Sequence, residues 1–189
     1  MEIFDPHPAY AELHCLSNFS FQRGASQPEE LVERAVALGY SALAITDECS
    51  VAGVVRAHGE ARKPGSRGLK LLLGAEFRVS LAGTDSGFTV IALAHHLQGW
   101  GNLCEFITVA RRATPKGEYQ VGWSDPENQA LWARLQGCEI LLALPSAINI
   151  EAACAITTGA RALFGLNLWL AVPARLGPDD ALQDRKSVV

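Results

Sequence analysis

The sequence shows few of the features that characterise membrane-spanning, secreted or phosphate-binding proteins. Its longest nearly apolar stretch, residues 163–172, is about half of the ~20 residues that a membrane-spanning helix needs. Its first residues, MEIFDPHPAYAEL, lack a basic region followed by an apolar segment. Lys and Arg number 16 against 20 Asp and Glu, and they form no run. We therefore expect no membrane span, no secretory signal and no basic stripe along this chain.

Cysteine use points to a reducing compartment. The five cysteines are odd in number and widely spaced, and none forms a C-x-x-C pair of the kind found in zinc knuckles or redox centres. A chain of 189 residues that is 49% hydrophobic and 19% charged is long enough to bury a core without metal or disulfide support. The composition indicates a cytoplasmic globular protein of one domain.

Apolar strands alternate with helices along the chain. Strands are predicted at 10–16, 41–46, 69–79, 88–94, 139–144 and 166–172. The first helix follows a capping box at residues 26–29 and ends at Gly39, and further helices are predicted at 51–61, 99–112, 126–136 and 150–163. This alternation predicts an α/β fold with a parallel, barrel-like sheet.

Polar side chains follow several of these strands, at the place where parallel α/β folds gather reactive groups. They are His14 with Asn18, Asp47 with Glu48, Glu76, and His95 with His96. Imidazole and carboxylate groups together could bind a divalent cation. The plainer alternative is structural: His14 would be a buried histidine bonded to backbone, and Asp47 and Glu48 would cap the following helix. The residues alone leave both interpretations open.

Two long segments carry a family resemblance. Residues 10–26 (YAELHCLSNFSFQRGAS) and 39–58 (GYSALAITDECSVAGVVRAH) resemble the N-terminal polymerase-and-histidinol-phosphatase (PHP) domain of bacterial C-family DNA polymerases, in particular the error-prone subfamily. LGAEF at 73–77, GWGNL at 99–103 and LFG at 163–165 extend the likeness over nearly the whole chain. The resemblance implies a PHP-type distorted (β/α)7 barrel, incomplete at its C-terminus.

The resemblance also implies that this chain descends from metal-binding proteins. Active PHP members hold up to three metal ions with His, Asp and Glu side chains and hydrolyse phosphoesters. His14 and Glu76 match ligand positions outright, and Asp47 and Glu48 lie at a neighbouring motif. These four residues are expected to be vestigial metal-site positions, of which His14 and Glu76 are the candidate ligands. No catalytic residue is assigned.

Other ligand positions are lost. Leu16 and Thr89 stand where the family has histidines, Arg23 stands where it has an acidic ligand, and Glu48 stands where it has a histidine. Leucine offers no lone pair, and the positive charge of Arg23 repels cations. We expect at most one weakly bound divalent ion, Zn²⁺ or Mn²⁺. An ion pair between Arg23 and Glu76 could take the place of the metal.

The function that the resemblance implies is that of a larger enzyme. The parent protein would be a DNA-directed DNA polymerase, a nucleotidyltransferase of replication across damage and of repair synthesis, with Mg²⁺ in a polymerase domain outside this chain. This segment would be a catalytically degenerate structural platform. Its partners would be the rest of the polymerase chain, primed DNA through other domains, accessory mutagenesis proteins and the sliding clamp. The rivals are a free-standing metal-dependent phosphoesterase or exonuclease and a non-enzymatic scaffold.

The last six residues differ from the rest. DRKSVV at 184–189 is out of keeping with the family, and one back-translation of it resembles the start of a sequencing adapter. We expect a partial PHP-like domain over residues 1–183 and a non-native tail over 184–189.

Overall fold

The computed structural model describes residues 10–80, 87–124 and 126–172. The expected tail at 184–189 lies outside these residues. The chain divides into two compact units, Met1–Leu73 and Gly74–Val189, and strand β3 (Lys70–Ser80) runs from one into the other. The single PHP-like domain over 1–183 stays a prediction.

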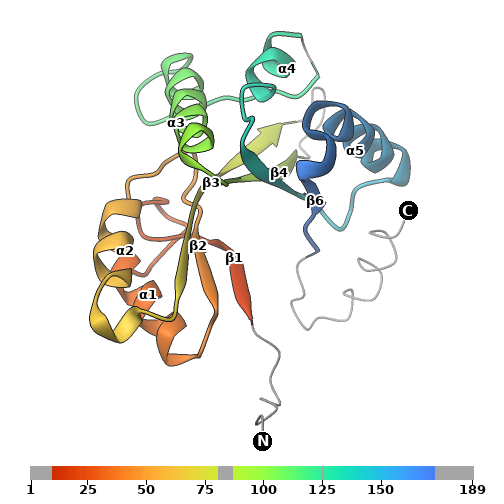
Figure 1. Cartoon of the computed structure of the whole chain (residues 1–189). Helices are drawn as coiled ribbons and strands as arrows, with labels where there is room; N and C mark the ends of the chain where they lie inside the picture. The colour runs from red at the N-terminus through yellow and green to blue at the C-terminus, as the bar shows by residue number, and fades with distance from the viewer. Residues whose placement is uncertain (1–9, 81–86, 125, 173–189) are drawn as a thin grey trace, which may run out of the picture. The chain divides into compact units, whose positions relative to one another are not determined.

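The N-terminal unit consists of parallel strands with two helices. Strand β1 (Ala11–Cys15) pairs with β2 (Ala42–Ile45), and β2 pairs with the first four residues of β3. Helices α1 (Pro28–Ala37) and α2 (Val54–Ala61) lie side by side in Figure 1 and pack against each other, and a short 3-10 turn, η1 (Pro64–Ser66), follows. Their shared core consists of Val32, Ala35, Leu43, Ile45, Ala57 and Leu69.

Local sequence determines where α1 begins and ends. The capping residue is Gln27, one residue later than predicted, and its backbone N–H donates to the Glu30 carboxylate at 2.8 Å. At the other end Gly39 has φ +72°, as predicted for a left-handed cap. The N–H groups of Gly39 and Tyr40 donate to the carbonyls of Val36 and Ala35, which is a Schellman motif.

The C-terminal unit contains the second half of β3, β4 (Gly87–Ala94), β5 (Cys138–Ala143) and β6 (Leu168–Leu170). Its helices are α3 (Leu97–Arg112), α4 (Pro126–Trp132) and α5 (Ile150–Phe164), with a short 3-10 turn, η2 (Gly165–Asn167), before β6. Each predicted helix and strand is present, so the α/β class is confirmed. Helix α4 and strand β6 are both shorter than predicted.

The prediction of a parallel sheet is wrong for β4. Strand β4 runs antiparallel to both β3 and β5, whereas β1, β2 and the start of β3 are parallel, as are β5 and β6. Only six residues separate the end of β3 from the start of β4. A parallel connection needs a crossover of a dozen or more residues, so this short link permits only an antiparallel pair.

Alternation along β3 separates two environments in the C-terminal unit. The Phe77 ring packs against Phe106 at 4.6 Å and Trp132 at 5.9 Å between centroids, and Trp132 also contacts Trp123. Glu76 points to the opposite face of the strand from Phe77, because successive side chains alternate. Glu76 was predicted at a strand end, but it lies inside β3 and its side chain is fully buried.

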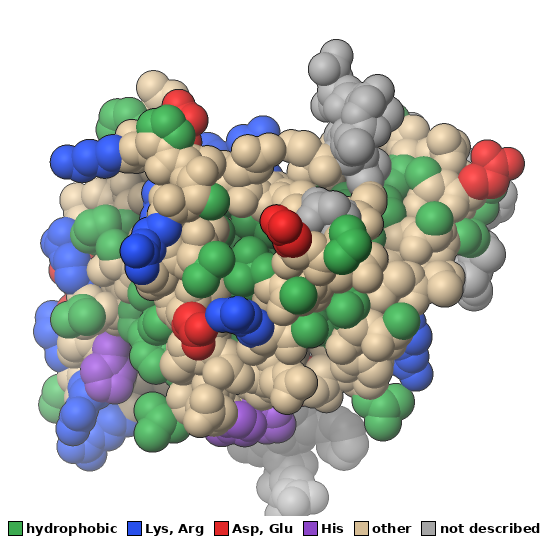
Figure 2. All heavy atoms as spheres, turned by 90° about the horizontal axis from the view of Figure 1, so that it is seen from above, with side chains coloured by type: hydrophobic (Ala, Val, Ile, Leu, Met, Phe, Trp, Pro, Cys, Tyr) green, Lys and Arg blue, Asp and Glu red, His purple; other side chains and the backbone are tan. Residues whose placement is uncertain are grey.

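The surface is mixed in character. Figure 2 shows charged side chains of both signs scattered among hydrophobic ones on one face. Phe21, Leu97 and Leu166 are each more than four-fifths exposed. Within the described ranges, no helix combines the length and hydrophobicity that crossing a membrane requires.

Candidate functional site

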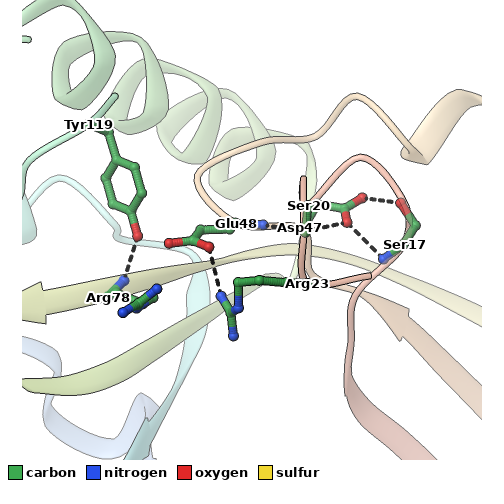
Figure 3. A network of polar contacts seen from close by, with 7 residues as sticks. All are labelled: Ser17, Ser20, Arg23, Asp47, Glu48, Arg78 and Tyr119. Carbon is green, nitrogen blue, oxygen red and sulfur yellow. Dashed lines mark hydrogen bonds and ion pairs between the residues drawn. The ribbon is translucent and has the colours of Figure 1, made fainter. Parts of the chain in front are cut away.

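Asp47 is the centre of a buried polar network in the N-terminal unit. Its Oδ1 accepts hydrogen bonds from the Ser17 backbone N–H at 2.8 Å and from the Ser20 hydroxyl at 2.7 Å. Its Oδ2 accepts one from the Ser17 hydroxyl at 2.7 Å. Figure 3 shows these contacts between the loop after β1 and the end of β2. The structure therefore connects Asp47 to the β1–α1 loop, in contrast to the helix-capping alternative.

Close backbone approaches shape this network. The loop folds back on itself, so that a Cβ at Gly24 would lie 1.9 Å from the Ser17 carbonyl oxygen. A Cβ at Gly53 would lie 2.7 Å from Asp47 Oδ2. Both positions therefore require glycine for reasons of space. The Asp47 carboxylate is enclosed by the chain itself, and Ser17, Ser20 and Asp47 are all buried.

Glu48 and Arg23 form an ion pair beside this network. Arg23 Nη1 donates to Glu48 Oε2 at 2.8 Å, and the side chains are 33% and 19% exposed (Figure 3). The Glu48 backbone N–H donates to the Ser20 hydroxyl at 2.9 Å, which ties the pair to the Asp47 network. Arg23 thus has Glu48 as an ion-pair partner, and the expected ion pair between Arg23 and Glu76 stays a prediction. Two residues that the family resemblance placed at substituted ligand positions thus neutralise each other.

The β1 positions differ from one another in environment. His14 is exposed, in contrast to the alternative of a buried histidine, and its backbone N–H donates to Glu12 Oε1 at 3.0 Å. Leu16 is half-buried. Burial, with smaller contributions from the charges of Glu12 and Asp47, raises the pKa of the Cys15 thiol to about 11. Cys15 is therefore protonated near neutral pH, whereas a cysteine ligand must be a thiolate.

Glu76 and Thr89 belong to the C-terminal unit. In the β3–β4 register Glu76 lies opposite Ile91 and Thr89 lies opposite Arg78, so Glu76 and Thr89 are diagonal neighbours on one face. Arg78 therefore occupies the position directly across from Thr89, which the family resemblance places at a lost ligand position. His14 is in the other unit, and the pairing of His14 with Glu76 as metal ligands stays a prediction.

His95 and His96 have local structural roles. His96 caps α3, and its Nδ1 accepts the Gly99 N–H at 3.2 Å. His95 Nδ1 lies 3.5 Å from Glu139 Oε1, and the other oxygen of Glu139 accepts the Trp169 indole N–H at 2.8 Å. Both histidines therefore make local contacts within the C-terminal unit.

The donor set around Asp47 does not fit a resident metal ion. A carboxylate has about four lone-pair positions, and three of those on Asp47 already receive hydrogens from the protein. Glu48 is neutralised by Arg23, whose positive charge opposes cation binding. Among the described residues, no group of three or more His, Cys, Asp or Glu side chains is arranged to hold a metal ion.

Ser17 and Ser20 are the site residues that sequence reasoning missed. They lie three residues apart in the segment LSNFS, directly after β1. Short hydroxyl side chains in a loop after a parallel strand could have indicated hydrogen bonding to the neighbouring strand end. Which acceptor they meet depends on contacts across 27 and 30 residues of sequence.

Comparison with known proteins identifies the family. Residues 12–165 match the PHP domain family. The chain belongs to the PHP domain family. This PHP chain is 49% identical over 174 residues to the error-prone DNA polymerase of Aromatoleum aromaticum, covering 90% of this chain and 15% of that protein. It is 45% identical over 177 residues to the corresponding polymerase of Dechloromonas aromatica, covering 92% and 16%.

These matches relate the chain to the N-terminal PHP region of error-prone DNA polymerases, as the sequence resemblance predicted. The PHP chain spans less than a fifth of the length of these curated relatives. The relatives are DNA polymerases, and their activity is a property of the whole proteins.

Solved structures share the fold. A crystal structure described as a metal-dependent phosphoesterase from Bifidobacterium adolescentis has a TM-score of 0.65 at 18% identity, covering 96% of this chain and 82% of that chain. An amidohydrolase from Chromobacterium violaceum has a TM-score of 0.58 at 17% identity, covering 80% and 74%. At these identities the likeness establishes the PHP-type fold and nothing about activity.

Proposed function

We propose that this chain is the PHP part of an error-prone DNA polymerase, which synthesises DNA across damage and during repair. Within that enzyme it acts as a structural platform without a catalytic site of its own. The identity of 45–49% to error-prone polymerases over about nine-tenths of the chain supports the parent enzyme. The polymerase chemistry, with its Mg²⁺, belongs to other domains of the parent protein.

The observation that carries the platform role is the enclosure of Asp47. Its carboxylate accepts three hydrogen bonds from Ser17 and Ser20 and links the loop after β1 to the end of β2. Hydrogen bonds to a buried carboxylate stabilise a fold when all the donors are satisfied. The Arg23–Glu48 pair supplies charge balance within the protein, a task that a metal ion performs in active members.

The rival function is a metal-dependent phosphoesterase or exonuclease of the PHP family. The phosphoesterase-like fold alone does not favour it, because many activities share one fold. Hydrolysis in such sites needs ions that activate water and clamp both the attacking and the leaving oxygen. We propose His14 and Glu76 as remnants of that lineage, able to support at most one loosely held Zn²⁺ or Mn²⁺.

The test is release of the 3′ nucleotide from a labelled primer by the purified chain, with Mn²⁺ or Zn²⁺ added. A His14→Ala, Glu76→Ala double variant is the matched control. We expect negligible release by both proteins. Robust metal-stimulated release by the parent chain that disappears in the double variant would establish the exonuclease and overturn the platform role.

The proposed parent enzyme also implies a cellular location and binding partners for this chain. We propose a cytoplasmic location, contact with the remaining polymerase chain, and access to primed DNA, a sliding clamp and accessory mutagenesis proteins through other domains. Reading the natural gene beyond codon 183 tests this proposal. An open reading frame that continues into a paired-aspartate polymerase site is expected, and a free-standing gene would contradict it.

A further inference from the structure

The segment that spans the end of α3 and the residues after it concentrates positive charge in an acidic chain. Residues 111–119 (RRATPKGEY), here named the basic turn, contain Arg111, Arg112 and Lys116 and a single acidic residue, Glu118. The chain as a whole has a net charge of −4. The basic turn lies entirely in the C-terminal unit. Its local charge is therefore opposite in sign to that of the whole chain.

Hydrogen bonds close the basic turn onto the end of α3. The Thr114 hydroxyl donates to the Glu118 carbonyl at 3.0 Å, and the Glu118 N–H donates to the Pro115 carbonyl at 3.1 Å. Gly117 has φ +99°, which permits the reversal. Arg112 and Lys116, both exposed, are thus held on one short, closed segment.

Tyr119 fixes an aromatic ring among these cations. Its hydroxyl oxygen accepts a hydrogen bond from the Arg78 backbone N–H at 2.8 Å, as Figure 3 shows. This hydrogen bond holds the Tyr119 side chain to β3. The Arg111 guanidinium carbon lies 5.9 Å from the ring centroid, within the range of a cation–π interaction. Arg78, whose side chain is exposed, adds a fourth cation to this part of the C-terminal unit.

A groove borders the basic turn. It has a volume of about 660 Å³ and is bounded by the end of α3, the segment 120–124 and α4. Ala113, within the basic turn, and Gln120, directly after it, line this groove together with Val109, Trp123 and Arg134. The groove therefore adjoins the basic turn, and its own lining carries one cation, Arg134, and one carboxylate, Glu127.

Stabilisation of the helix explains only part of this arrangement. Arg111 and Arg112 in the last turn of α3 interact favourably with the helix dipole. Lys116 and Tyr119 lie beyond the helix, and the dipole argument does not account for them. Cations around a fixed aromatic ring beside a groove are the combination that single-stranded nucleic acid uses, through phosphate pairing and base stacking.

We propose that the basic turn and the adjoining groove form a weak binding site for single-stranded DNA. Phosphates pair with Arg112 and Lys116, and a base lies against the Tyr119 region. Few phosphate contacts are available, so binding is detectable at low salt and falls steeply as salt rises. This site differs from the contacts to primed DNA that other domains of the parent polymerase are expected to make.

The test measures the fluorescence anisotropy of a labelled oligothymidylate during titration with the 189-residue chain at several low salt concentrations. The oligothymidylate has about 15 nucleotides, a length that one such surface can cover. The test variant is Arg112→Glu, Lys116→Glu. The control is Arg62→Glu, Arg67→Glu, which changes the net charge equally at exposed positions of the other unit. Circular dichroism checks that both variants fold.

We expect the test variant to bind at least tenfold more weakly and the control to change affinity less than twofold. The dependence of log K on log salt should also become shallower by about 1.4, since each lost single-strand phosphate contact removes ~0.7. Equal effects of the two variants, or no binding by the parent chain at the lowest salt, would overturn the proposal. If polyglutamate competes as strongly as unlabelled oligothymidylate does, the surface binds acidic peptides rather than single-stranded DNA.

Discussion

At the scale of single residues, Asp47 is the most consequential side chain of the candidate site. Two hydroxyls and one backbone N–H depend on its carboxylate, and all of these groups are buried. Glu48 follows it directly and makes a partly exposed ion pair. We therefore expect these adjacent acidic residues to contribute very different amounts to the free energy of unfolding.

Asp47→Ala should lower the free energy of unfolding by about 3 kcal/mol, because buried donors lose their acceptor. Glu48→Ala is the matched control and should cost less than about 1 kcal/mol, since partly exposed ion pairs are weak. Urea denaturation followed by circular dichroism measures both. Similar losses of unfolding free energy for the two variants would show that the hydrogen bonds of Ser17 and Ser20 to Asp47 do not stabilise the fold.

The cysteines provide a pH-dependent prediction. Burial raises the pKa values of the Cys15 and Cys138 thiols to about 11, whereas Cys154 is exposed. At pH 8 iodoacetamide should modify Cys154 well before Cys15 and Cys138, as peptide mass spectrometry would show. A Cys154→Ser variant, which removes the fast site, is the control. Rapid alkylation of Cys15 in the folded chain would contradict this order.

The same raised pKa values affect stability. A thiol whose pKa is higher in the folded than in the unfolded chain stabilises the fold below the unfolded pKa, and this contribution is lost as pH rises through the folded pKa. The free energy of unfolding should therefore fall between about pH 9 and pH 11. Urea titrations across this range test the decline, and a Cys15→Ala variant should show a shallower one.

At the scale of elements, the start of α3 is set by a close approach to the chain before β5. A Cβ at Gly99 would lie 1.9 Å from the Gly137 carbonyl oxygen, whereas a Cβ at Gly101 would meet nothing within 4 Å. Both glycines lie in α3, only two residues apart. They form a matched pair in which helix propensity is equal and only space differs.

Gly99→Ala should destabilise the C-terminal unit by about 2 to 3 kcal/mol through overpacking against backbone. Gly101→Ala should stabilise it by about 1 kcal/mol, because alanine favours an exposed helix position over glycine. All four tryptophans lie in the C-terminal unit, so tryptophan fluorescence during urea unfolding reports on it. Equal shifts for the two variants would refute the close approach.

At the scale of the whole molecule, the hydrogen-bonded Asp47 carboxylate and the Arg23–Glu48 ion pair predict indifference to metal ions. A ligand present at 100 times its dissociation constant would add about 2.7 kcal/mol and raise the melting temperature by several degrees. We expect EDTA, Zn²⁺ and Mn²⁺ each to shift the melting temperature by less than about 1 °C. A clear rise with Zn²⁺ that is lost in His14→Ala would show that the ancestral site still binds an ion.

Much of the fold was predictable from local pattern. Apolar runs and helical spacing placed each helix and strand within a few residues, and Gly39 correctly marked the end of α1. The direction of β4 was predicted wrongly, although the short link before it contained the necessary information. The alternating apolar pattern is the same in parallel and antiparallel strands, so it does not determine direction.

The sequence by itself determined the α/β class and the family relationship, whereas the loss of metal ligands at Leu16, Arg23 and Thr89 stays a prediction. Only the tertiary structure decided that Arg23 pairs with Glu48 and that Ser17 and Ser20 enclose Asp47. Periodicity, capping and motif identity are properties of neighbouring residues, which a sequence displays directly. The partner of a buried carboxylate is chosen by the register of β1 against β2, which brings together groups that are 25 to 30 residues apart.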